Sequence, residues 1–93
     1  MSRAVFFIDT QDGSVASRRQ LVEAALVDED QQPLKPWHPI PGPPDASTMW
    51  YAVMRKKMRG VFIGMLCIRH LDRQASLESQ GWVEVPVEAI RVS

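Results

Sequence analysis

Residues 49–69, MWYAVMRKKMRGVFIGMLCIR, decide the fold of this 93-residue chain. Apolar positions in the first part of this stretch recur at helical spacing. Asp45 offers an N-cap before them, and Gly60 is a natural residue just beyond a helix C-terminus. The cations that precede Gly60 suit the negative end of a helix dipole. Together these signals predict a helix over about 46–59.

The alternative for the same residues is a β-hairpin. The aromatic and β-branched residues near the start of the stretch also favour strands. In this alternative a strand over 49–54 is followed by a basic loop at 55–60 and a second strand over 61–69. In both interpretations residues 61–69 form a central buried strand, because the run is almost entirely apolar.

The N-terminal third predicts one strand and one helix. Residues 4–10 are rich in β-branched and aromatic types, and their continuous apolar run indicates a strand buried on both faces, ended by the turn signal Asp12-Gly13. Ser17 and Gln20 fit a capping box that begins a helix over about 17–28. The alternative is a strand over 20–27 that turns at the three acidic residues that follow it.

A proline-rich segment and two short elements complete the chain. Residues 31–45 hold six of the seven prolines, which predicts an extended or turn-rich loop, pinned to the domain by Trp37 and Ile40. Residues 71–80 allow a short helix stopped by Gly81. Residues 82–92 predict a last strand or strand pair, with a proline that demands an edge position or a bend.

The expected fold is therefore a single small α+β domain covering residues 1–93. It has a short β-sheet, with strands near 4–10, 61–69 and 82–92, and two to three helices. A small all-β barrel is the alternative if both the 17–28 and 46–59 helices fail. Apolar residues make up 45% and charged residues 24% of the chain, which is typical of a folded protein.

The sequence predicts no catalytic, metal-binding or cofactor-binding residue, and we do not expect an enzyme. Cys67 and His70 are close in sequence, but in a strand they point to opposite faces, and a metal site needs a second such pair. The other histidine, His38, stands in the proline segment. The chain contains neither of the glycine-rich motifs that bind phosphates, Gly-x-Gly-x-x-Gly and Gly-x-x-x-x-Gly-Lys-[Ser/Thr].

A cytoplasmic location is the simplest expectation from the apolar runs and the cysteine count. The longest apolar run has eight residues, whereas spanning a bilayer needs about 20. No membrane partner is therefore expected. Cys67 is the only cysteine, so no intrachain disulfide can form.

Charge is distributed unevenly although eleven basic residues balance eleven acidic ones. Residues 46–73 carry six basic residues and one acidic residue, between two acidic flanks. This basic, Met- and Trp-rich region, taken as segment 49–62, is the predicted contact surface. The residues predicted to bind a partner are Trp50, Arg55, Lys56, Lys57, Met58 and Arg59.

We expect a small non-enzymatic binding protein that acts by protein–protein contact through segment 49–62. An accessory protein, adaptor or inhibitor, of the kind that phages and mobile elements encode, fits this profile. The expected partner is another protein, with an acidic surface opposite the basic residues, and a homodimer is compatible with a small core. The alternative function is a nucleic-acid-binding regulator that uses the same basic cluster on phosphates.

Overall fold

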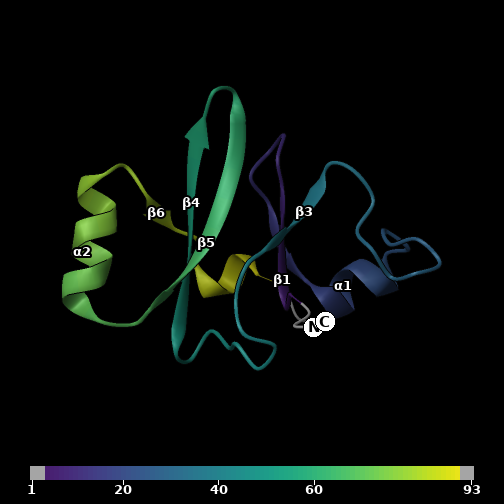
Figure 1. Cartoon of the computed structure of the whole chain (residues 1–93), viewed down its shortest axis with the longest axis horizontal. Helices are drawn as coiled ribbons and strands as arrows, with labels where there is room; N and C mark the ends of the chain where they lie inside the picture. Colours follow the sequence, from purple (N-terminus) through teal and green to yellow (C-terminus); the bar gives the residue numbers. More distant parts are fainter. Residues whose placement is uncertain (1–3, 91–93) are drawn as a thin grey trace.

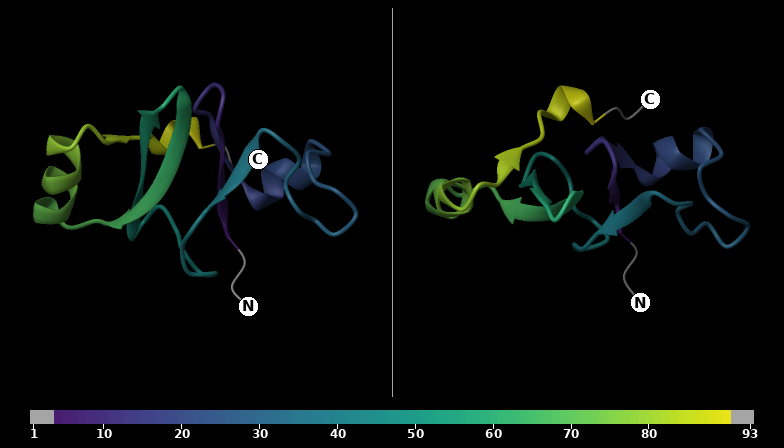
Figure 2. Two further views of the ribbon diagram at one scale, coloured as in Figure 1. Left: turned by 45° about the horizontal axis from the view of Figure 1, so that its top comes forward. Right: turned by 90° about the horizontal axis from the view of Figure 1, so that it is seen from above.

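Within residues 4–90, which the computed structural model describes, six strands form two three-stranded antiparallel sheets (Figure 1). The first sheet has the order β2-β1-β3, with β1 (Phe6–Asp9) between β2 (Val15–Ser17) and β3 (Trp37–Ile40). The second has the order β5-β4-β6. Helix α1 (Arg18–Glu23) covers the outer face of the first sheet, and α2 (Leu71–Ser79) covers the outer face of the second (Figures 1 and 2).

Strand β1 confirms the predicted strand near 4–10 and its burial on both faces. Phe6 and Ile8 point into a cluster shared by the two sheets, whereas Phe7 points to the opposite side and packs with Leu21 of α1. The predicted turn also forms, and Gly13 adopts the positive φ of 80° that glycine tolerates. One apolar strand thus joins two core clusters.

Helix α1 is shorter than the predicted helix over 17–28. It ends at Glu23, and Ala25 then takes a positive φ of 57°. The acidic residues that follow form a turn of their own, because the Asp28 carboxylate accepts hydrogen bonds from the N–H groups of Asp30 and Gln32, both at 2.9 Å. These carboxylates therefore do not oppose the helix dipole.

Half of the predicted capping box is present at the start of α1. The Ser17 hydroxyl accepts a hydrogen bond from the Gln20 N–H at 3.2 Å. The reciprocal bond is missing, because Gln20 Oε1 is buried without a hydrogen-bond partner among the described residues. The first bond stabilises the helix, whereas the orphan oxygen costs free energy.

We expect opposite effects from two substitutions at this cap. Ser17→Ala removes the cap and should lower the free energy of unfolding by about 1 kcal/mol. Gln20→Met keeps the length of the side chain, removes the orphan oxygen and should raise that free energy by about 1 kcal/mol. Urea unfolding followed by circular dichroism measures both. A loss of stability in Gln20→Met would show that this amide has a favourable partner in solution.

The proline segment contains an edge strand, β3, which pairs with β1. The Thr10 N–H donates to Pro36 O at 3.2 Å, so the alternation of the ladder turns the ring nitrogen of Pro39 away from β1. Proline is tolerated there because no donor is needed. Ile40 is buried and Trp37 packs beside Phe7, which confirms that these two side chains pin the segment.

The predicted helix over 46–59 is wrong, and a hairpin takes its place. Strand β4 (Tyr51–Met58) and strand β5 (Val61–Ile68) pair along their whole length. Arg59 and Gly60 form the two-residue turn with φ of 52° and 84°, as a hairpin turn with two positive φ values requires. The alternative hairpin was right in kind but not in extent, since β4 continues through the basic residues that it assigned to a loop.

Strand β5 lies at the edge of its sheet, so its predicted central position is also wrong. The central strand is β4, which pairs with β5 on one side and with the short β6 (Val83–Glu84) on the other. Strand β6 is much shorter than the predicted strand over 82–92, because Pro86 stops the ladder and a single 3-10 turn, Val87–Ala89, follows. Residues 91–92 lie outside the described part of the chain.

The predicted helix over 71–80 is confirmed as α2, and Gly81 follows it with φ of 96°. The α+β class is confirmed too, but with two short sheets in place of one. A cluster with members from both sheets holds them together, including Ile8, Ile40, Val53 and Val85. No closed barrel forms among residues 4–90. None of the described helices is long and apolar enough to cross a membrane.

Candidate interaction surface

The predicted basic cluster is divided between the two faces of β4. Side chains alternate along a strand, so Arg55 and Lys57 lie on the face that Val53 turns toward the first sheet. Lys56 and Met58 lie on the opposite face, which is the one that α2 covers. Arg59 is at the hairpin turn. The six predicted contact residues therefore do not form one continuous basic patch.

The Arg55 side chain is held by the protein itself. Its guanidinium donates to Gly13 O at 2.6 Å and lies 5.8 Å from the centre of the Phe62 ring. Hydrogen bonds from Ser14 and, more weakly, the charge of Arg55 hold the pKa of the Asp12 carboxyl below its usual value. Asp12 thus stays ionised near Arg55 and offsets part of its charge.

Two further cations of the cluster also have intramolecular contacts. Lys57 Nζ lies 5.5 Å from the centre of the Phe62 ring, on the same face as Arg55. Lys56 Nζ donates to Gln80 O at 2.5 Å, at the C-terminus of α2, where a cation is favoured by the helix dipole. These contacts give the cluster a structural role within the chain.

Trp50, in contrast, is exposed at the end of the hairpin opposite the turn. Trp50 is 67% exposed, and the neighbouring Met49 is 72% exposed. The register brings β5 and the start of α2 to the same end, because Arg69 N–H donates to Trp50 O at 2.9 Å. Ile68 and Leu71 are 52% and 85% exposed there. We call these four exposed residues at one end of the hairpin, Met49, Trp50, Ile68 and Leu71, the hairpin-end patch; strand alternation places Trp50 and Ile68 on its two opposite faces.

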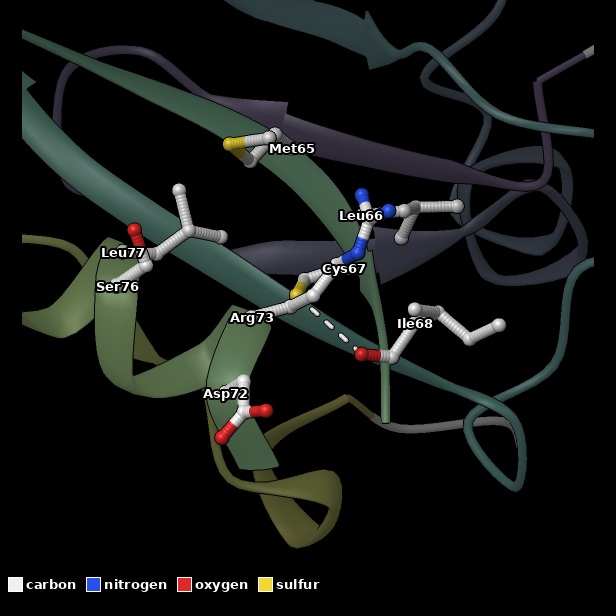
Figure 3. Close-up of a pocket in the computed structure, with 8 residues that line it drawn as sticks. All are labelled: Met65, Leu66, Cys67, Ile68, Asp72, Arg73, Ser76 and Leu77. Carbon is white, nitrogen blue, oxygen red and sulfur yellow. Dashed lines mark hydrogen bonds between the residues drawn. The ribbon is translucent and has the colours of Figure 1, made fainter. Parts of the chain in front are cut away.

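A groove of about 520 Å³ adjoins this patch between β5 and α2 (Figure 3). It forms because α2 is loosely seated: none of its residues is buried, and Leu77 is the residue that packs against the sheet, beside Met54 and Cys67. We call this hollow the β5–α2 groove. Its lining consists of residues 65–68 of β5 together with Asp72, Arg73, Ser76 and Leu77.

Cys67 and His70 end up in different environments. Cys67 is a free, buried cysteine whose thiol donates to Ile68 O at 3.3 Å, whereas His70 is exposed at the N-cap of α2. Among residues 4–90, no three histidine, cysteine, aspartate or glutamate side chains gather where they could hold a metal ion. His38 lies on the edge strand β3.

The predicted segment 49–62 includes Met49 and Trp50, but the sequence indicated neither Ile68 and Leu71 nor the groove. Residues 68 and 71 lay in elements predicted to be core strand and helix. A signal was present in the helix, because the residues of α2 are polar apart from three, which is unusual for a helix that packs fully on a sheet.

Comparison with known proteins identifies no relative of this chain. The chain matches no model of a known protein family, no curated protein and no solved structure at a significant level.

Proposed function

We propose that this chain is a small non-enzymatic binding protein, an adaptor or inhibitor, that acts by protein–protein contact through segment 49–62. The observation that carries the proposal is the exposure of Trp50 and Met49 at one end of that segment. Large apolar side chains that are exposed close together are candidates for a contact surface, because exposed apolar patches on monomeric proteins mark interaction sites. Tryptophan is also among the residues that contribute most to binding free energy at interfaces.

The placement of the cations favours a protein partner over a nucleic acid. Nucleic-acid surfaces gather cations on one face to follow the phosphate backbone. Here Arg55 and Lys57 lie on the opposite face from Lys56, and Arg55 already donates to Gly13 O. We propose that the contact with the partner protein is centred on Trp50, at the end of segment 49–62 that lies away from these cations.

A photo-crosslinking amino acid at position 50 tests this function in cells of the source organism. We expect it to capture one discrete protein, whereas the same group at position 22 should not. Val22 is the matched control because it is also exposed, but lies on α1, which packs against the other sheet. Equal capture from the two positions would contradict the proposal, as would a gel shift of nucleic acid that depends on Arg55 and Lys57.

Affinity for the captured protein then measures the contribution of Trp50. Trp50→Ser should weaken binding by about thirtyfold or more, because truncation of a central interface tryptophan costs at least about 2 kcal/mol. Val22→Ser should leave the affinity unchanged. Isothermal titration calorimetry gives both values. Unchanged binding by Trp50→Ser would place the contact elsewhere on the chain.

A further inference from the structure

The outer edge of β5 carries unpaired backbone groups. The Phe62 N–H donates to Thr10 O rather than to β4, whereas the Arg69 N–H donates to Trp50 O at the β4 side. Backbone groups alternate in direction along an antiparallel strand, so the even-numbered residues of β5 point away from β4. The N–H and C=O groups of Gly64 and Leu66 therefore face outward, and no described residue bonds to them.

This edge lacks the features that usually protect an edge strand. Natural edge strands are blunted by charged side chains, prolines or bulges. Strand β5 reads VFIGMLCI, with no charged residue and no proline, and it pairs with β4 without a bulge. Thr10 covers the edge only at Phe62. The remaining edge is suited to pairing with another extended chain.

The β5–α2 groove runs along part of this open edge, from Met65 to Ile68, and Gly64 lies just beyond its lining. Four consecutive β5 residues, 65–68, line it, although a single face of a strand exposes only every second side chain. The wall of the groove is thus the edge of the strand itself. These four residues extend about 13 Å along the strand, so an extended peptide of about four residues fits beside them.

The side chains of the groove define the chemistry of its occupant. Met65 and Leu77 offer apolar surface at one side. The Arg73 side chain extends from α2 toward β5 across the groove (Figure 3), and no described residue pairs with it. The neighbouring Arg69, by contrast, is paired with Glu84 at 3.0 Å. Arg73 is therefore available to a carboxylate from outside the chain, one that stays clear of the Asp72 carboxylate in the same groove lining.

We propose that the β5–α2 groove binds an extended acidic segment of a partner protein as an added strand. The segment hydrogen-bonds to Gly64 and Leu66, places apolar side chains against Met65 and Leu77, and pairs a carboxylate with Arg73. Strand addition of this kind obtains affinity from main-chain hydrogen bonds and specificity from the side chains that flank them. The inference rests on the proposed function, because it names the part of the partner that lies beside the hairpin-end patch.

Selection from a phage-displayed library of short linear peptides tests the groove without knowledge of the partner. We expect peptides that alternate apolar residues and carry an aspartate, a glutamate or a free C-terminal carboxylate. A synthetic copy of a selected peptide should protect the Gly64 and Leu66 amides from hydrogen exchange. Arg73→Glu should bind this peptide about tenfold more weakly, since it replaces an attraction with a repulsion. Lys35→Glu makes the same charge change at an exposed site outside the groove and should bind normally.

Several outcomes would overturn the proposal. The proposal is wrong if the chain selects no more peptide than a Met65→Lys, Arg73→Glu double variant does. It is also wrong if the selected peptides leave the Gly64 and Leu66 amides unprotected. Protection of these amides without peptide, rising with protein concentration, would show that a second copy of the chain occupies the edge instead. If position 50 still captures one protein while the groove selects nothing, the proposed function stands and this inference fails. If the groove binds a selected peptide but position 50 captures no protein, the groove inference stands and the proposed contact through segment 49–62 fails.

Discussion

Phe7→Ala should lower the free energy of unfolding by about 3–5 kcal/mol. Phe7 is 1% exposed and packs with Leu21 and Ala16 between the first sheet and α1. Its ring also lies 4.9 Å from the Arg18 guanidinium, which covers it on one side. A chain of 93 residues has a total stability of only about 5–14 kcal/mol, so this loss is a large part of the whole.

Urea unfolding measures this loss, with Trp50→Ala as the matched aromatic control. Trp50 is exposed, so its removal should change the free energy of unfolding by less than about 0.5 kcal/mol. The contrast separates the two roles of aromatic side chains in this chain, core packing and partner contact. Similar losses in the two variants would mean that Trp50 is covered in solution and is not part of a free surface.

Gly64→Ala is the second large expected effect, at about 1–3 kcal/mol of destabilisation. A Cβ atom at position 64 would lie 2.9 Å from Ile40 Cδ1 and 3.5 Å from Ile8 Cδ1. Both isoleucines belong to the first sheet, so the two sheets approach each other closely at Gly64. The methyl group forces them apart or forces Ile40 out of its rotamer.

A double-mutant cycle identifies this clash as the cause. Ile40→Val removes the Cδ1 atom, so the double variant Gly64→Ala, Ile40→Val should be more stable than the sum of the single effects predicts. Gly60→Ala is the control: its Cβ would meet nothing within 4 Å, and its cost of about 1 kcal/mol comes from the positive φ of the turn. Ile40→Val should not rescue it. Additive effects at positions 64 and 40 would contradict the proposed close contact.

The sequence predicts the elements whose signals are local and unambiguous. Strand β1 follows from a continuous apolar run, and the end of α2 from Gly81, because each signal has one physical meaning in its context. Ser17 likewise identified the start of α1, since its hydroxyl needs no tertiary partner to cap a helix. The length of α1 was not predictable in this way, because the helix ends where Ala25 takes a positive φ and the Leu26 N–H donates to Leu21 O, and alanine is no signal for such a turn.

The hairpin at 51–68 was the alternative and not the favoured prediction, because two of its signals have two meanings. Val53 and Met54 are adjacent and both buried, as expected on the inner side of a helix, but they are buried on opposite faces of a central strand. Gly60 has the positive φ that serves both a helix C-terminus and a hairpin turn. Only the pairing of β4 with β5 and β6 decides between these meanings, and that pairing is tertiary.

The candidate surface was predicted in part for the same reason. Composition pointed to Trp50, which is exposed, and to a basic cluster, which strand alternation divides between two faces. The partners of Arg55 and Lys56 lie 42 and 24 residues away in sequence, so no local pattern reveals that these charges are engaged. The groove depends on how loosely α2 sits on the sheet, which follows from packing and not from any motif.

The burial of Cys67 beneath α2 makes its thiol a probe of local opening between α2 and the sheet. It is the single thiol of the chain, and it is buried in the lining of the β5–α2 groove, so a water-soluble disulfide reagent reaches its sulfur faster when α2 and the sheet separate. The labelling rate of native protein therefore measures how often this layer opens, on a scale from local fluctuation to global unfolding. The same chemistry distinguishes a groove that is preformed from one that the helix must move to admit its occupant.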